Sequence, residues 1–229
     1  MTRWLVVNAD DFGLSNGINR GILEAHSGGI VTSTSLMVGA PAAQQAARAA
    51  ADHPELSIGL HFVDDGRADL DDPGQLAHSF ALQLARFREL TGRDPTHVDS
   101  HHHVHSASAG RRETFAELVG PLHAPLRGQS GVRYIGAFYG QWEPGVTRLR
   151  HVQRPFLMQL IQTIVGEGMS ELGCHPGRLG DFNSSYSAER EVELATLTEP
   201  GLREEIESLG VELVNFAAFI GTPNAGAQE

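Results

Sequence analysis

Near its N-terminus the chain reads, at residues 4–13, WLVVNADDFG, an apolar run that ends in two carboxylates and a glycine. Such a run, bounded by polar and turn-forming residues, predicts a buried β-strand, which we place at residues 4–8. Successive side chains of a strand point in different directions, so Asp10 and Asp11 can do different jobs. One can bind a metal ion while the other faces a substrate as a base, and the cation would keep both ionised near neutral pH. The alternative is a solvated strand-to-helix turn in which an aspartate caps the next helix and Gly13 makes the bend.

Similar apolar or β-branched runs recur along the chain and alternate with helical patterns. The predicted strands are residues 4–8, 31–38, 56–61, 97–99, 132–135, 171–174 and 211–216. The predicted helices are residues 16–25, 41–51, 75–90, 114–119, 152–166 and 188–197. This alternation favours a parallel sheet with helices outside, and about seven or eight such units favour a closed or nearly closed barrel. We therefore expect an α/β protein with a single-domain β/α barrel-like fold, which includes a distorted or incomplete TIM-type barrel.

Polar side chains of chemical interest stand where the predicted strands end. They are Asp10, Asp11, His61, Asp99, His101 and His175. In β/α barrels the carboxyl ends of the strands and the loops after them build the active site, so residues distant in sequence converge there. The pattern predicts one site at the C-terminal ends of the strands.

Residues 99–105 read DSHHHVH, four histidines in five residues directly after a carboxylate. Imidazole is the commonest protein metal ligand, and Asp99 can either join the metal or orient a ring by hydrogen-bonding its other nitrogen. Strand alternation would send His101, His103 and His105 to one face, whereas a helical turn would pair His101 with His105. Three or four ligands from one short segment would be crowded, so some of these rings must serve the structure or face the substrate. We take His101 as the first candidate ligand and His105 as the next.

Two further histidines stand at strand ends. His61 lies in IGLHF, residues 58–62, where Gly59 permits close approach of the backbone; the alternative is a satisfied core histidine. His175 lies in LGCHPG, residues 172–177, where proline and glycine predict a sharp turn just after it. A general acid needs such placement and a pKa near the working pH, which histidine has. The alternative for His175 is a packing role before the turn.

Length and composition limit the classes of function. A chain of 229 residues suffices for one domain with a full core, which we place at residues 1–220, followed by a small, polar, flexible tail at 221–229. The formal net charge of −11 argues against nucleic acid as a partner, since that needs clustered basic residues. The lone cysteine, Cys174, excludes an intrachain disulfide and a thiolate-based structural zinc site, and we expect it to be buried in its strand. Any metal must therefore be bound by nitrogen and oxygen.

The location of the protein follows from its apolar runs. None approaches the roughly 18 to 20 residues that span a bilayer. The first residues enter a strand pattern without a long apolar region or a small-residue cleavage site. We expect a cytoplasmic protein with no membrane partner.

Together these motifs resemble the YdjC-like carbohydrate deacetylases, the group that includes chitooligosaccharide deacetylase. The resemblance covers most of the chain in order, spacing and residue identity. Its segments are residues 7–15, 29–34, 59–62, 95–105, 137–140 and 174–176.

The resemblance implies a β/α-barrel-like, often dimeric protein that removes acetyl groups from N-acetylated amino sugars with one divalent metal ion. By position it makes Asp11, His61 and His101 the metal ligands, Asp10 the general base and His175 the general acid. We accordingly expect a small N-acetylated sugar as substrate and a homodimer as the assembly.

The motifs indicate the reaction more closely than they indicate the metal ion or the sugar. Two imidazoles and a carboxylate suit zinc, whereas the resemblance also admits magnesium. The segment between His61 and His97 is shorter than in chitooligosaccharide deacetylases, which leaves the particular sugar open. The candidate substrate contacts are His103, His105, Tyr139 and Trp142.

Two other functions compete with metal-assisted amide hydrolysis. A metal-dependent phosphoesterase on a barrel predicts two metals about 3.5 to 4 Å apart and basic residues for the phosphate. The motif segments hold no lysine or arginine until Arg178. A non-catalytic carbohydrate- or metal-binding protein would have no use for Asp10, which no ligand role requires.

Overall fold

The computed structural model describes residues 2–143 and 145–220, so the predicted tail lies outside the described residues. The strands are β1 (Arg3–Phe12), β2 (Ser33–Leu36), β3 (Ser57–Phe62), β4 (Val98–Ser100), β5 (Arg133–Ile135), β6 (Gly168–Cys174) and β7 (Val211–Leu213). The α-helices are α1 (Asn16–Ser27), α2 (Ala43–Ala50), α3 (Pro73–Thr91), α4 (Ala109–Val119), α5 (Arg154–Ile164), α6 (Ser187–Leu197), α7 (Leu202–Ser208) and α8 (Ala217–Ile220). Three 3₁₀ segments complete the described elements: η1 (His101–Ser106), η2 (Gly120–Leu122) and η3 (Leu149–Val152).

The strands form one parallel sheet in the order β4-β3-β2-β1-β6-β5. β1 is central: it pairs with β6 along one edge, and with β7 and then β2 along the other. Residues 125–127 run along the free edge of β4, where Val98 donates to Pro125 O and accepts from Arg127 N. Within the described residues no strand pairing joins this edge to β5, so the sheet is a curled half-barrel. The predicted barrel-like fold is confirmed in its incomplete form.

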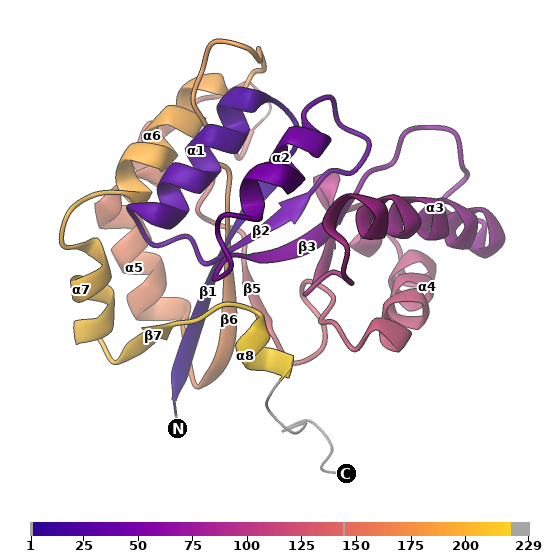
Figure 1. Ribbon diagram of the computed structural model, residues 1–229. Coiled ribbons are helices and arrows are strands. Elements are labelled where there is room, and N and C mark those ends of the chain that lie inside the picture. The colour runs from indigo at the N-terminus through magenta and orange to yellow at the C-terminus, as the bar shows by residue number, and fades with distance from the viewer. Residues whose placement is uncertain (1, 144, 221–229) are drawn as a thin grey trace.

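Helices surround the sheet, as Figure 1 shows. Local sequence signals start them: Ser15 accepts a hydrogen bond from Ile18 N at α1, and Asp72 caps α3 just before a proline. α3 buries Leu76, Phe80, Leu84 and Phe87, whose spacing places them on one helical face against the core.

The predicted strands are all confirmed, with boundaries shifted by a few residues. α4 is longer than predicted because Ser108 caps it upstream, accepting a hydrogen bond from Arg111 N. The short α7 was not predicted, since its seven residues carry only two buried side chains. Cys174 is buried in β6 as expected.

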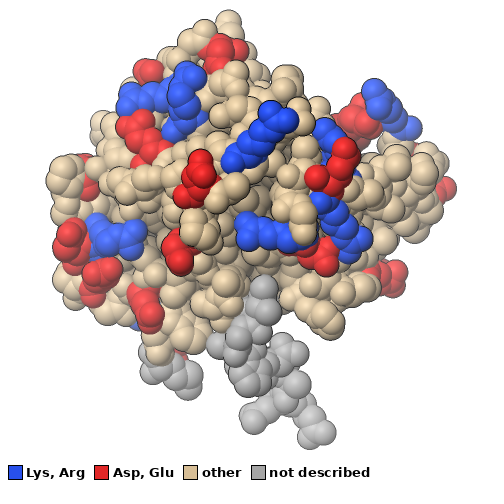
Figure 2. Space-filling view, in the orientation of Figure 1, with Lys and Arg blue, Asp and Glu red and all other residues tan. Residues whose placement is uncertain are grey.

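The surface is mixed in charge. Acidic and basic side chains lie next to one another on the face in Figure 2. Exposed ion pairs among the described residues include Arg178 with Glu24, at 2.6 Å. Exposed pairs of this kind contribute little to stability. Among the described residues, no helix has both the length and the apolar character needed to cross a membrane.

Candidate metal and catalytic site

The two aspartates lie in a bulge at the end of β1. The pairing of β1 with β2 shifts register between Ala9 and Phe12, and Asp11 has a φ of 69°. Asp tolerates this left-handed conformation better than most residues, and bulges re-aim side chains near active sites. Asp10 and Asp11 are therefore both buried and both line the same pocket, although they are adjacent in the strand.

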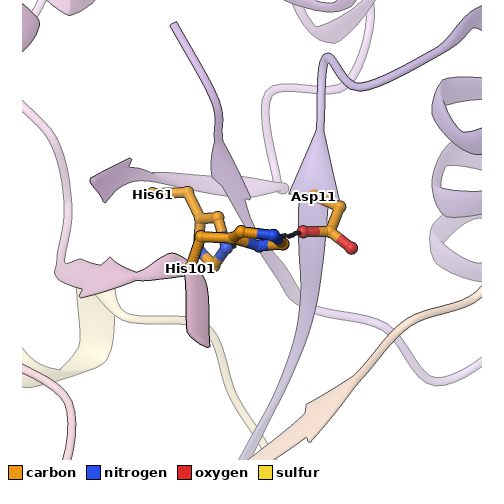
Figure 3. A group of neighbouring side chains, drawn as sticks. All are labelled: Asp11, His61 and His101. Carbon is orange, nitrogen blue, oxygen red and sulfur yellow. Dashed lines mark ion pairs between the residues drawn. The ribbon is translucent and has the colours of Figure 1, made fainter. Parts of the chain in front are cut away.

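Asp11, His61 and His101 converge from β1, β3 and the start of η1, as Figure 3 shows. Asp11 Oδ1 lies 3.5 Å from His61 Nε2 and 3.2 Å from His101 Nδ1. The three ligand atoms fall within 4.8 Å of one another. Asp11 Oδ1 and His61 Nε2 are buried without a hydrogen-bond partner among the described residues. Buried polar atoms without partners are rare, and two that face one point beside a third ligand atom suit a cation. The residues therefore fit a metal ion.

Asp99 orients one of these rings. Its Oδ1 accepts a hydrogen bond from His61 Nδ1 at 2.6 Å, and Ser35 Oγ lies 3.2 Å from the same nitrogen. The contact fixes the ring with Nε2 toward Asp11. Against the effect of burial, Asp99, Asp11 and Asp10 together raise the pKa of His61 to about 10. When a metal ion is bound, the proton would stay on Nδ1 and Nε2 would be the ligand atom. Of the two roles that the sequence left open for Asp99, the structure favours the orienting one.

Arg127 binds the remaining carboxylates. It donates two hydrogen bonds to Asp10, both at 2.7 Å, and contacts Asp99 at 2.6 Å and Glu171 at 2.8 Å. Burial alone raises the pKa of Asp10, but Arg127 outweighs it and holds that pKa below its usual value. Burial raises the pKa of Glu171 to about 7 despite the same arginine. Asp10 thus stays ionised although it is 3% exposed.

Asp10, His61 and Asp99 form a second group whose ligand atoms lie close together. A guanidinium already occupies their common side, because Arg127 Nη2 lies 2.7 Å from Asp10 and 2.6 Å from Asp99. A second cation there would meet this fixed positive charge. The group therefore does not fit a second metal.

His175 follows β6 at the mouth of the site. Its Nε2 lies 3.8 Å from Asp10 Oδ2, and its backbone N–H donates to the carboxylate of Glu193. Burial lowers the pKa of His175 to about 4, against the opposing effect of Asp10 and Asp11. His175 is therefore neutral at neutral pH.

The histidine segment is neither a strand nor a regular helix. It forms η1, in which His102 and His103 both have left-handed backbone conformations. His101, His102 and His103 line the pocket. His105 does not, because its Nδ1 lies 2.6 Å from Ser100 Oγ and its ring packs near Phe115, with centroids 6.1 Å apart. His105 is the candidate contact that the structure does not bring to the site.

The pocket above these residues has a volume of about 760 Å³. Aromatic rings form much of its wall: Tyr139 stacks on Tyr186 with centroids 4.4 Å apart, and Trp142 stands 57% exposed at the rim. The exposed ring of Trp142 suits the apolar face of a sugar. Tyr186 is buried, and its hydroxyl already donates to Glu193 and accepts from Gly140 N.

Several site residues were missed from the sequence. They are Arg127, Glu171, Tyr186, Arg190 and Glu193. Arginine and glutamate are ordinary surface residues, and α6 has a polar sequence that gives no sign of burial. The available signal for Arg127 was its place between Leu126 and Gly128 in a short loop, which does not distinguish it from a solvated turn.

Comparison with other proteins finds relatives that match nearly the whole chain. The profile of the family described as YdjC-like protein matches residues 4–208. A carbohydrate deacetylase from Geobacillus stearothermophilus is 36% identical over 253 residues, covering 96% of this chain and 99% of that protein. A chitooligosaccharide deacetylase from Klebsiella pneumoniae (strain 342) is 32% identical over 258 residues, covering 93% of this chain and 98% of that protein.

Solved structures share the fold at lower identity. A protein from Enterococcus faecalis V583, provisionally named for cellobiose-phosphate cleavage, has a TM-score of 0.77 and 23% identity, covering 96% of this chain and 99% of that one. The T48 deacetylase, solved with substrate, has a TM-score of 0.58 and 15% identity, covering 97% and 93%. A family 4 acetyl xylan esterase from Clostridium thermocellum, solved with cobalt, has a TM-score of 0.56 and 15% identity. The match covers 96% of this chain and 93% of that one.

Proposed function

The chain belongs to the YdjC-like protein family, and on that premise we propose that it is a metal-dependent deacetylase. It hydrolyses the N-acetyl group of an amino sugar or short oligosaccharide and releases acetate. The observation that supports this most is the convergence of Asp11 Oδ1, His61 Nε2 and His101 Nδ1 at the base of the pocket, beside Asp10 and His175.

Asp11, His61 and His101 would hold one divalent ion. Buried negative charge supports it: Asp10, Asp11 and Asp99 lie together, paired with Arg127, Arg190 and His61. When bound, the ion lowers the pKa of a water molecule and polarises the acetyl carbonyl. Zinc is the first ion to test, because two imidazoles and a carboxylate suit it, and magnesium is the next.

Asp10 and His175 move the protons. Asp10 Oδ2, the oxygen nearer His175 Nε2, receives the proton of the attacking water, and Arg127 keeps this carboxylate fixed and ionised beforehand. The sugar nitrogen must gain a proton before it leaves. His175 is neutral in the free protein, so the proton it donates is one gained during the reaction, with Asp10 as the neighbouring source.

The pocket wall would bind the sugar. Tyr139 and Trp142 offer ring faces, and His103 presents its ring at the same wall, 5.4 Å from the ring of Tyr134. Glycosidic chains would extend past Trp142, which stands at the rim. The homodimer and the cytoplasmic location stay predictions.

The phosphoesterase alternative is less well supported. It requires a second metal, and Arg127 takes the place that the second group of ligands would offer. It also requires cations for the phosphate. Among the described pocket-lining residues the arginine is Arg190, which is already paired with Asp11.

The test is acetate release from a panel of N-acetylated sugars, including N-acetylglucosamine and its short oligomers, by protein stripped of metal and reloaded with zinc, magnesium, manganese or cobalt. We expect metal-dependent acetate from at least one sugar. Absence of acetate from every sugar, with metal shown to be bound, would contradict the proposed reaction and leave the metal site to another substrate.

A further inference from the structure

The two oxygens of Asp11 have different surroundings. Oδ1 faces the two histidines, whereas Oδ2 accepts a hydrogen bond from Arg190 Nη2 at 2.5 Å. Arg190 comes from α6, far along the chain, and its side chain is 7% exposed. Asp11 is the acidic residue that ion-pairs with it in the described part of the chain.

Arg190 is itself fixed by the turn after β6. Its Nη1 donates to His175 O at 3.3 Å, and its backbone carbonyl accepts from Gly177 N at 3.2 Å. Its guanidinium also lies 5.9 Å from the centroid of the Tyr186 ring. These contacts hold the backbone and the guanidinium of Arg190 beside Asp11.

Each carboxylate of the adjacent pair thus has its own buried arginine. Asp10 gives both oxygens to Arg127, while Asp11 gives one oxygen to Arg190 and keeps the other. A carboxylate without such a partner offers both oxygens to a cation and can bind it in two ways. Because Arg190 occupies Oδ2 of Asp11, only Oδ1 is left for a cation.

We propose that Arg190 is a positioning residue that makes Asp11 a ligand through Oδ1 alone, aimed at the point that His61 and His101 face. The proposal rests on the metal role of Asp11 in the proposed function. Arg190 lines the pocket, and it acts on that point through the second oxygen of Asp11. With Asp11 fixed in this way, a bound ion would keep positions for water and the acetyl carbonyl.

The variants are Arg190→Met, which keeps an unbranched chain without charge, and Arg190→Lys, which keeps a charge but loses the planar fork. Arg178→Met is the matched control, because Arg178 pairs with Glu24 on the exposed surface. Two readouts do not depend on turnover. They are the Kd for Zn²⁺, measured by competition with a chromophoric chelator, and the visible absorption spectrum of the Co²⁺-loaded protein, which reports coordination geometry.

We expect Arg190→Met to raise the Kd for Zn²⁺ by about 10- to 100-fold and to change the Co²⁺ spectrum. Arg190→Lys should lie between wild type and Arg190→Met, and Arg178→Met should match wild type. An unchanged Kd and spectrum in folded Arg190→Met would overturn the proposal. So would tighter Zn²⁺ binding with an unchanged spectrum, because Arg190 would then act only as a like charge near the ion.

Misfolding of Arg190→Met and failure of the proposed function can each be distinguished from failure of the proposed role of Arg190. If Arg190→Met does not fold, Arg190→Lys decides by the same two readouts. If wild type binds Co²⁺ but releases no acetate, the proposed function fails, while the spectra of the variants still decide the role of Arg190.

Discussion

Asp99 Oδ1 lies 2.6 Å from His61 Nδ1, and this contact decides which nitrogen of His61 faces the metal position. Both residues are almost fully buried, so water cannot replace the contact. The pairing is parallel across two neighbouring strands, with His61 on β3 opposite Asp99 on β4. The sheet register therefore sets the orientation of the ring.

Substitution of Asp99 tests this orientation. Asp99→Asn removes the charge that favours a proton on Nδ1 while nearly keeping the shape, so the Kd for Zn²⁺ should rise by about 10- to 100-fold. Asp94→Asn is the matched control, because Asp94 is an exposed carboxylate paired with Arg88. Equal affinities in wild type and Asp99→Asn, by chelator competition, would mean that Asp99 does not orient the ligand.

Asp10 is expected to act on protons and not on the metal. Asp10→Asn should lower kcat by roughly 10²- to 10⁴-fold, because the amide cannot take the proton of water. Metal content should remain at the wild-type level, and Arg127 keeps Asp99 and Glu171 as partners, so the fold should persist. Near-normal turnover with bound metal would remove Asp10 from its assignment as base.

The sequence predicted most of the fold but only part of the candidate site. The strands were predicted because their apolar runs are short and bounded by turn residues, and the strand ends correctly indicated Asp10, Asp11 and His61 as neighbours. The sequence allowed both a nearly closed and an incomplete barrel, since pairing between β4 and β5 depends on the intervening chain, residues 101–132. The alternation of strands and helices gives the number of β/α units, but it does not determine whether the barrel closes.

The sequence did not indicate the arginines that bind the two aspartates of the candidate site. Arg127 and Arg190 bind the carboxylates that the sequence did indicate, but their burial depends on contacts more than 100 residues away. The conformation of η1 was also hidden, because left-handed backbone at His102 and His103 breaks both strand and helix periodicity. No local pattern encodes either feature.

His97 should make stability fall at acid pH. Its ring is buried, stacks on Phe216 with centroids 4.1 Å apart, and lies 3.0 Å from the Thr96 hydroxyl. Burial lowers its pKa to about 3, despite the opposing charges of Asp99 and Asp10, so the native state holds a neutral ring. The stabilisation is complete above the unfolded pKa of about 6.5 and is lost progressively as pH falls below it.

The measurement is the free energy of unfolding of wild type and His97→Gln, by urea denaturation at pH 8 and pH 5. The difference between the two proteins should shrink by about 2 kcal/mol at pH 5, because the variant has no ring to protonate. His78→Gln, at an exposed position, is the control. A wild-type advantage that stays constant between the two pH values would contradict the assignment.

Trp142 is expected to contribute to sugar binding and not to chemistry. Trp142→Ala should raise KM roughly two- to tenfold for oligomers, the loss of one stacking contact, and leave kcat nearly unchanged. Because Trp142 is 57% exposed, the fold should be unaffected. Leu82→Ala removes a similarly exposed apolar side chain, 59% exposed on α3, and should alter neither constant. A large loss of kcat in Trp142→Ala would assign the ring a different role.

The most direct test of the central claim is a zinc titration of metal-free protein, with acetate and free amine measured together from the dimer of N-acetylglucosamine. We expect no reaction without metal, equal amounts of acetate and amine with it, and a rate that saturates at one ion per chain. A rate that does not depend on added metal, or that saturates at two ions, would contradict a single site at Asp11, His61 and His101.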